Sequence, residues 1–169
     1  AGVVTATVAQ ASAADLISAL GNAEATDALS MTFTDNSITA TDLNTLAGLT
    51  SVTLSADSGI TITALDGKSV AATDAVDAFE FADADTGVSL SGLTANDVLD
   101  LSGDLDATNL EAAAETNNTD VSEDGEWHYN STSGVLTYFD LQENVQTVAL
   151  DTDLTLTTDG TVDTFTIGA

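Results

Sequence analysis

Cysteine and proline are missing from this chain of 169 residues, and basic side chains are almost missing. Without cysteine the chain has neither disulfides nor thiolate metal sites. Without proline no strand loses a ladder hydrogen bond, which favours an extended and regularly bonded sheet. No apolar run approaches the ~20 residues of a membrane span, so we expect no membrane insertion.

Lys68 is the single basic residue, against 28 acidic residues, and the formal net charge is -27. Nucleic acids and anionic membranes are bound through clusters of Lys and Arg, so neither is an expected partner. Self-repulsion on this scale destabilises a compact chain unless cations screen or bridge the carboxylates. The hydrophobic fraction of 43% is too high for a disordered acidic tail, so the sequence predicts a folded protein with cations as partners.

Three stretches repeat around an aspartate: DNSITATDL (35–43), DSGITITAL (57–65) and DTGVSLSGL (85–93). The aspartate with its small polar neighbours favours a turn, and the alternation that follows buries one face of a strand. Each stretch also follows another alternating segment, so each repeat is predicted to be a hairpin-like strand–turn–strand unit. The predicted inward residues are Leu29, Met31, Phe33, Val52, Leu54, Ile60, Ile62, Phe79, Phe81, Val88, Leu90, Leu99 and Leu101.

Short helices are predicted between these units. SAADLISALG (12–21) has Ser12 as an N-cap, Asp15 three residues later and Gly21 as a stop, and TATDLNTLAG (39–48) repeats the pattern. The aspartates that open the three repeats are 22 and 28 residues apart. A period in the twenties is typical of a solenoid, whose rungs bury their apolar faces by stacking.

The predicted fold is therefore all-β and solenoid-like (β-helix-like), with short helical turns. A β-sandwich of short strands explains the same pattern and is the alternative. We expect a degenerate repeat part, 1–103, and a strand-rich part, 104–169, packed on it as one continuous domain. The chain begins without a methionine, and we expect it to be a segment of a larger protein.

In the second part, 106–118 is predicted to be a short helix and 119–126 an acidic loop. EWHYNSTSGVLTYFD (126–140) is predicted to be a hairpin that turns at Ser133 and Gly134. Two further strands are expected, at 144–150 and at 154–167.

The acidic, proline-free composition, rich in Thr, Ser, Ala and Leu, resembles that of bacterial S-layer and repeats-in-toxin (RTX) surface proteins. NDVLDLSGDLD (96–106) resembles the segment that follows their calcium-binding repeats, YNSTSGVLTYFD (129–140) their hairpin, and VDTFTI (162–167) their secretion signals. The glycine-aspartate nonapeptide that defines RTX repeats does not occur here, so its calcium sites are not carried over. The resemblance implies a secreted or cell-surface bacterial protein, with a structural or adhesive role and contacts to itself or to neighbouring domains.

Closely spaced carboxylates occur in DADTG (83–87), DLD (104–106), DVSEDGE (120–126), DTD (151–153) and DGTVD (159–163). Calcium prefers such oxygen ligands together with backbone carbonyls. Any one cluster can simply cap a turn, and a halophilic surface explains the charge without specific sites. Taken together, the clusters predict at least one bound Ca2+. The predicted ligands are Asp83, Asp85, Asp104, Asp106, Asp151, Asp153, Asp159 and Asp163.

The sequence does not predict an enzyme. His128 is the only histidine, and its place between Trp127 and Tyr129 on a predicted strand puts it on the solvent face, so a Ser-His-Asp triad is not expected. Zinc lacks ligands. A hydrolase built on an acid pair is a third hypothesis only, because carboxylates occur throughout the chain.

Glycan or ice binding is the alternative function from a different class. Aromatic side chains that could stack on a sugar occur only around Trp127, Tyr129 and Tyr138, where a small aromatic core explains them equally. Thr-x-Thr pairs, such as Thr61 with Thr63, resemble ice-binding arrays when they are stacked. More often they form the solvent side of strands, where threonine has high β-propensity.

Overall fold

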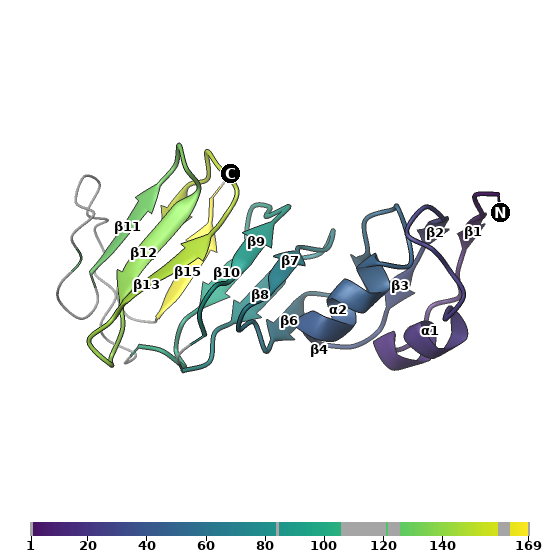
Figure 1. Ribbon diagram of the computed structural model, residues 1–169, viewed down its shortest axis with the longest axis horizontal. Coiled ribbons are helices and arrows are strands. Elements are labelled where there is room, and N and C mark those ends of the chain that lie inside the picture. The colour runs from purple at the N-terminus through teal and green to yellow at the C-terminus, as the bar shows by residue number, and fades with distance from the viewer. Residues whose placement is uncertain (1, 84, 106–120, 122–125, 159–162, 169) are drawn as a thin grey trace.

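The computed structural model describes residues 2–83, 85–105, 121, 126–158 and 163–168. Across these residues the chain is mainly β with two short helices and mixed sheets, so the prediction of a mainly β protein is confirmed. The molecule is elongated, and its elements follow one another along the long axis, from the N-terminus to strands β11, β12 and β13 (Figure 1). Neither of the two helices in the described part is long and apolar enough to cross a membrane.

The helices are α1 (Ala13–Ala19) and α2 (Ala40–Ala47). The strands are, in chain order, β1 (Thr5–Thr7), β2 (Ala28–Ser30), β3 (Thr32–Phe33), β4 (Ser37–Thr39), β5 (Ser55–Ala56), β6 (Ile60–Thr63), β7 (Ser69–Ala71), β8 (Asp77–Glu80), β9 (Ser89–Ser91), β10 (Val98–Asp100), β11 (Trp127–Asn130), β12 (Val135–Phe139), β13 (Val145–Ala149), β14 (Leu156–Thr157) and β15 (Thr164–Ile167).

Both predicted helices form, and each has the expected N-cap. The Ser12 hydroxyl accepts from the Asp15 backbone N–H at 3.2 Å, and Thr39 caps α2 in the same way through Asp42 at 3.1 Å. Each cap hydroxyl also donates to the carboxylate of that aspartate, at 2.9 Å in both cases. The caps satisfy N–H groups that the first turn of a helix leaves without partners.

A six-stranded sheet runs in the order β14-β15-β10-β8-β6-β4. Its strands β4, β6, β8 and β10 are parallel neighbours, and β15 pairs antiparallel with β10. Cα pairing aligns one apolar residue from each of five strands in a row across this sheet. The row consists of Ile38, Ile62, Phe79, Leu99 and Phe165, all of which are buried.

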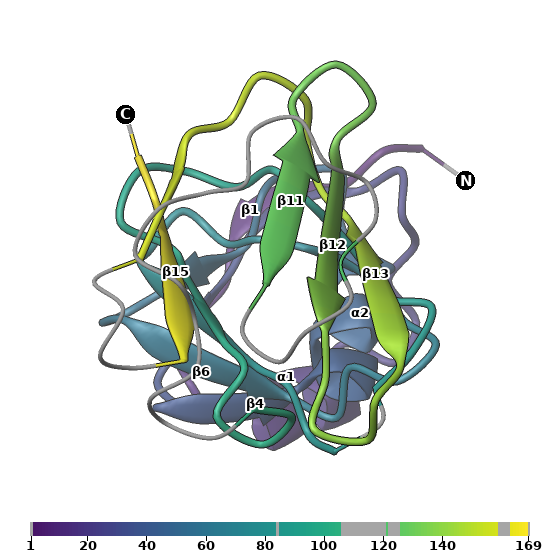
Figure 2. The same ribbon diagram turned by 90° about the vertical axis from the view of Figure 1, so that its left-hand side faces the viewer.

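A five-stranded sheet runs in the order β11-β12-β13-β9-β7. Strands β7 and β9 are parallel, whereas β11, β12 and β13 form an antiparallel meander. Viewed along the long axis, β15 and the meander lie on opposite sides of the molecule (Figure 2). The Trp127 ring of β11 meets the Phe165 ring of β15 edge-on at 4.7 Å, so the core between the two sheets is continuous there.

The predicted hairpin-like units are corners between sheets, which corrects the expected pairing. Strands β5 and β6 flank the turn at Asp57, yet β5 pairs in parallel with β3 while β6 pairs in parallel with β4. The repeat at 85–93 differs again, because its strand β9 joins the five-stranded sheet. The chain bends at the predicted turns, at residues 36, 57–58 and 87, but a turn signal does not say which strand each arm will pair with.

All of the predicted inward residues are buried except Val52, which is 37% exposed. The prediction was wrong there because residues 51 and 52 form a bend, where strand alternation does not apply. Thr50 occupies the inward place instead. Its hydroxyl accepts from the Leu29 N–H at 3.0 Å and donates to the Leu29 carbonyl at 2.9 Å.

The predicted hairpin at 126–140 is confirmed as β11 and β12. Gly134 has φ +68 in its turn and donates its N–H to the Asn130 carbonyl at 2.8 Å. A Cβ at this position would collide with the Leu150 carbonyl, so both φ and space require glycine. The strand predicted within 144–150 is β13, whereas the range 154–167, predicted as one strand, contains two antiparallel strands, β14 and β15. The predicted helix at 106–118 and nearly all of the acidic loop lie outside the described residues.

Candidate functional site

Buried carboxylates are the most distinctive polar feature of the interior. Asp77, Asp97, Asp104 and Asp140 are each at most 1% exposed. A carboxylate removed from water is costly unless hydrogen-bond donors or opposite charges stabilise it. One lysine cannot neutralise all of these groups, so the donors around them decide whether the fold tolerates them.

Backbone N–H groups supply many of those donors. The Asp97 carboxylate accepts from the Asp77 N–H on the neighbouring strand at 2.9 Å and from the Thr94 N–H at 2.7 Å. The Asp77 carboxylate in turn accepts from the Thr73 N–H at 2.6 Å and from the Thr73 hydroxyl at 2.8 Å. Two buried aspartates thus hold two successive loops and tie β8 to the start of β10.

The environment of Asp77 opposes its ionisation despite these bonds. Burial, together with the negative charges of Asp97 and Asp74, raises the pKa of Asp77 to about 6. Asp27 is the opposite case, because backbone N–H groups of Val4 and Glu24 lower the pKa of its carboxyl. The charged form of aspartate is therefore disfavoured at Asp77, where β8 starts, and favoured at Asp27, just before β2.

A local bonding pattern recurs among the aspartates. Three of them accept the N–H of the residue three positions earlier: Asp27 from Glu24 at 3.1 Å, Asp85 from Ala82 at 2.9 Å and Asp97 from Thr94 at 2.7 Å. Such aspartate-backbone bonds satisfy loop N–H groups that have no strand partner. In these loops, carboxylate oxygens therefore accept N–H groups that backbone carbonyls would accept in an ordinary turn.

Asp27, Asp77 and Asp97 were not predicted as site residues, although the sequence contains a signal for them. Asp27, Asp77, Asp97 and Asp163 stand in the tripeptides DAL, DAF, DVL and DTF. In each tripeptide the aspartate is buried and so is the Leu or Phe two positions later. An acidic residue on the same face as a core residue at a strand start therefore predicts a buried carboxylate, and those of Asp27, Asp77 and Asp97 accept backbone N–H groups.

Asp83, Asp85, Asp104 and Asp106 were predicted as calcium ligands. Asp83 is exposed, Asp85 is 7% exposed and bonded to the Ala82 N–H, and Asp104 is fully buried. The Asp104 carboxylate accepts the Tyr138 hydroxyl at 2.7 Å. Asp106 lies outside the described residues.

The other predicted ligands are Asp151, Asp153, Asp159 and Asp163. Asp151 accepts the Leu93 N–H at 2.8 Å, Asp153 is exposed with φ +61, and Asp163 is 1% exposed. Asp159 lies outside the described residues. Where the structure describes the chain, no three His, Cys, Asp or Glu side chains are grouped to hold a metal ion.

Tyr138 connects the loop after β10 with the meander. Burial, and then its hydrogen bond to Asp104, raises the pKa of the Tyr138 hydroxyl, so it remains a protonated donor. Asp140 is buried nearby and accepts the Asn144 N–H and the Gln146 side-chain amide, both at 2.7 Å. The carboxylates of Asp104 and Asp140 thus accept hydrogen bonds from β12, from the loop after it and from β13.

The residues predicted to contact a glycan are mostly buried. Trp127 is 3% exposed and Tyr138 is fully buried, so neither ring offers a face on which a sugar could stack. Tyr129 is partly exposed, and its hydroxyl donates to the Asp151 carbonyl at 2.5 Å. The aromatic residues of this hairpin form core contacts and internal hydrogen bonds.

His128 was predicted to lie on the solvent face, and this prediction was wrong. The side chain is 8% exposed, and the adjacent Trp127 is buried as well. Consecutive strand residues point to opposite faces, so both faces of β11 are covered at this point. Alternation predicts a solvent face only for a strand that is covered on one side.

Threonine pairs lie in register on part of the six-stranded sheet. Thr39 pairs with Thr63 across β4 and β6, but Thr61 then pairs with Ala78, and Glu80 pairs with Asp100. Ala78, Glu80, Val98 and Asp100 therefore separate the threonines of β4 and β6 from those of β15 on this face. An unbroken threonine array does not extend across the sheet.

Comparison with protein-family models, with curated proteins and with solved structures finds no match to this chain. Function is therefore inferred from its own residues and geometry.

Proposed function

We propose that the chain is a structural or adhesive module of a secreted or cell-surface protein, built as an irregular solenoid that ends in antiparallel strands. The observation that carries this proposal is the row of five paired apolar residues across strands that follow one another along an elongated molecule. Each passage through β4, β6, β8 and β10 adds a strand beside the previous one. Repeated units of this kind make extended scaffolds.

The buried carboxylates support a structural role. A catalytic acid or base must reach a substrate proton, whereas Asp77, Asp97 and Asp140 are buried and bonded to internal donors. Perturbed pKa values also arise in structural hydrogen-bond networks. Asp77, with its raised pKa, belongs to such a network, since its bonds hold the loop before β8.

Calcium enters the proposal through the exposed carboxylates. The buried ones have internal donors, but a net charge of -27 still opposes compaction. Exposed groups such as Asp83 and Asp153 are accessible to divalent cations from solution. Extracellular modules bind calcium at ~0.1 to 1 mM, a range suited to a protein that folds outside the cell.

Surface location can be tested on the source cells. Antibodies against the chain are applied to intact cells, to the culture supernatant and to lysed cells. The proposal expects signal on intact cells or in the supernatant. Signal that appears only after lysis, with a cytoplasmic marker, contradicts it.

Calcium dependence is tested by melting the purified chain in chelator, in millimolar calcium, and in sodium chloride of equal ionic strength. Specific sites predict a calcium gain that sodium chloride does not reproduce, whereas general screening predicts equal gains. A ligand at 100 times its Kd adds about 2.7 kcal/mol to the free energy of unfolding. No gain beyond matched ionic strength would remove calcium from the proposal.

A further inference from the structure

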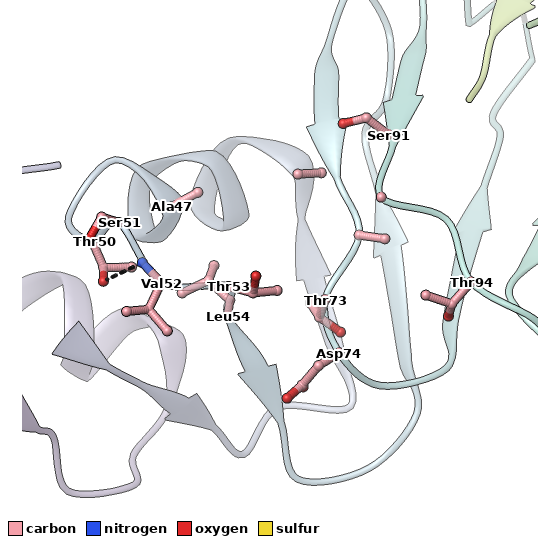
Figure 3. A pocket seen from close by; sticks show the side chains of 13 residues that line it. Ala47, Thr50, Ser51, Val52, Thr53, Leu54, Thr73, Asp74, Ser91 and Thr94 are labelled. Carbon is pink, nitrogen blue, oxygen red and sulfur yellow. Dashed lines mark hydrogen bonds between the residues drawn. The ribbon is translucent and has the colours of Figure 1, made fainter. Parts of the chain in front are cut away.

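A groove of about 490 Å³ lies where α2 ends beside β7. The segment from Thr50 to Leu54 forms one side, and Thr73, Asp74, Ser91 and Thr94 lie across from it (Figure 3). Most lining residues are small, and Val52 contributes an exposed apolar side chain. A volume of this size is within the range of ligand sites in proteins.

Strand β7 borders this groove with an open edge. It is the terminal strand of the five-stranded sheet. On the side of β9, the Lys68 carbonyl accepts the Ser89 N–H at 2.9 Å, and the Ala72 N–H donates to the Ser91 carbonyl at 2.8 Å. Alternate strand residues direct their backbone groups to opposite edges, so Ser69 and Ala71 face away from β9.

Helix α2 covers one end of that outer edge and leaves the other end open. The Asn44 side-chain amide donates to the Ser69 carbonyl at 2.8 Å, in the place that a neighbouring strand would occupy. The helix ends at Ala47, and beyond it Ala71 is exposed and lines the groove. In the described part of the chain, Ala71 has no hydrogen bond from this side.

We propose that the groove binds an extended, basic peptide segment that adds a strand to the free edge of β7. Pairing with the Ala71 N–H and C=O requires an extended backbone, as in other strand-addition complexes. Small groove walls beside Val52 accept an apolar side chain from alternate positions of the peptide. Ser69–Ala71 is short, so the backbone contribution is limited to a few hydrogen bonds.

The negative charge of the groove and of the whole chain favours a basic peptide over a second copy of this chain. No basic residue lines the groove, and Asp74 lies exposed on its rim. The Asp74 Oδ2 accepts the Ser55 hydroxyl at 2.7 Å, while its Oδ1 makes no hydrogen bond to the described residues. A second chain of charge -27 would be repelled, whereas lysine or arginine side chains are attracted to this rim.

The test uses fluorescein-labelled hexapeptides and fluorescence anisotropy on the full chain at low salt. The first peptide alternates lysine and valine, the second replaces lysine with glutamate, and the third is the first with alternate backbone amides N-methylated. We expect saturable binding of the first alone. Amide chemical shifts should change at Ala71 and at the residues from Thr50 to Thr53.

Two variants and one control locate the binding site. Val52→Trp fills the groove, and Ala71→Pro removes the outward N–H while leaving the bonds to β9 in place. Val145→Trp adds the same bulk at a 53% exposed position on β13, outside the groove. We expect affinity to fall about tenfold or more for the first two variants and to stay unchanged for Val145→Trp.

Three results would overturn the proposal: equal binding by all variants, equal binding of the N-methylated peptide, or no saturable binding of the lysine peptide. If Val52→Trp fails to fold, Ala71→Pro and the N-methylated peptide decide the question. The inference goes beyond the proposed surface role and does not depend on it, because the groove would bind the peptide in any compartment.

Discussion

Every strand pair within residues 2–105 is parallel, whereas the pairs within residues 126–168 are antiparallel. Parallel neighbours cannot be joined by a tight hairpin, so each needs a longer connection with its own backbone donors to satisfy. In the parallel region, aspartates such as Asp77 and Asp97 accept many of those donors. In the antiparallel region the hairpin ladder satisfies the strands directly, and Asp140 accepts the Asn144 N–H in the loop between β12 and β13.

The two regions also differ in what fills their cores. The parallel region buries mainly aliphatic and Phe side chains, such as Ile60, Ile62 and Phe79. The antiparallel region buries Trp127 and Tyr138, and Trp127 packs on Phe165. The comparison indicates that loop carboxylates stabilise the first region and aromatic packing the second. Strands β10 and β15 join them in one sheet, so we expect one cooperative unit.

The largest effect is expected for Ile62→Asp, in the middle of the parallel region. Ile62 is fully buried between Ile38 and Phe79, so the variant buries an unpaired charge and should lose about 3–5 kcal/mol. Fluorescence of Trp127, which lies in the other region, should change at the same temperature as far-UV circular dichroism. Separate transitions would mean that the two regions unfold independently.

Thr61→Asp is the matched control for this experiment. It introduces the same charge one residue away, on the opposite and half-exposed face of β6. Its free energy of unfolding should change by less than about 1 kcal/mol. A loss equal to that of Ile62→Asp would show that added charge, not burial, determines the effect.

The next effect tests the aromatic core of the antiparallel region. Trp127→Ala should lose about 3–5 kcal/mol, because it removes the ring that packs on Phe165 and leaves a cavity. Trp127→Phe keeps part of that contact and should lose less. Urea denaturation followed by circular dichroism measures both. If Trp127→Ala were as stable as the parent, aromatic packing would not stabilise this region.

A smaller loss is expected for Tyr138→Phe. The change removes only the hydroxyl that donates to the buried Asp104 carboxylate, and should cost about 1–3 kcal/mol. The Tyr129→Phe variant removes a hydroxyl in a more exposed setting and provides the comparison. Equal losses for the two variants would contradict the particular importance of the buried Tyr138–Asp104 pair.

The smallest effect is a dependence on pH in the parallel region. The pKa of Asp77 is raised to about 6, so its stabilising contribution is present below pH ~4 and is lost as pH rises through 6. Asp27 has a lowered pKa and acts with the opposite sign, since its contribution is lost only as pH falls below its ordinary value. Melting the parent and Asp77→Asn at pH 5 and pH 7 should show a smaller pH difference for the variant. An unchanged difference would assign the pH dependence to other groups.

Local signals in the sequence predicted the elements well. Ser12 and Thr39 were recognisable as caps, Gly134 as a hairpin turn, and every residue that strand alternation placed inward is buried except Val52. These features depend on contacts within a few residues, which a single sequence records. Val52 and His128 were mispredicted because a bend in one case and a second covered face in the other replaced simple alternation.

Strand partners and carboxylate roles could not be predicted in the same way. The turn at Asp57 is visible in the sequence, but the separation of its two arms into different sheets depends on contacts with other parts of the chain. The lack of basic partners suggested cations for the closely spaced aspartates. Backbone N–H groups, which no composition reveals, serve as donors to several of them.

The most direct test of the account compares Asp97→Asn with Asp57→Asn in one chemical denaturation experiment. Both variants remove one negative charge, but Asp97 is buried and accepts the N–H groups of Asp77 and Thr94, whereas Asp57 is exposed. An asparagine at position 97 would place its side-chain NH2 against one of these two N–H groups. We therefore expect the free energy of unfolding to fall by about 2–4 kcal/mol. Asp57→Asn should be neutral or slightly stabilising, because it reduces the size of the net negative charge. If Asp97→Asn is as stable as Asp57→Asn, carboxylate–backbone bonding does not hold the parallel region together.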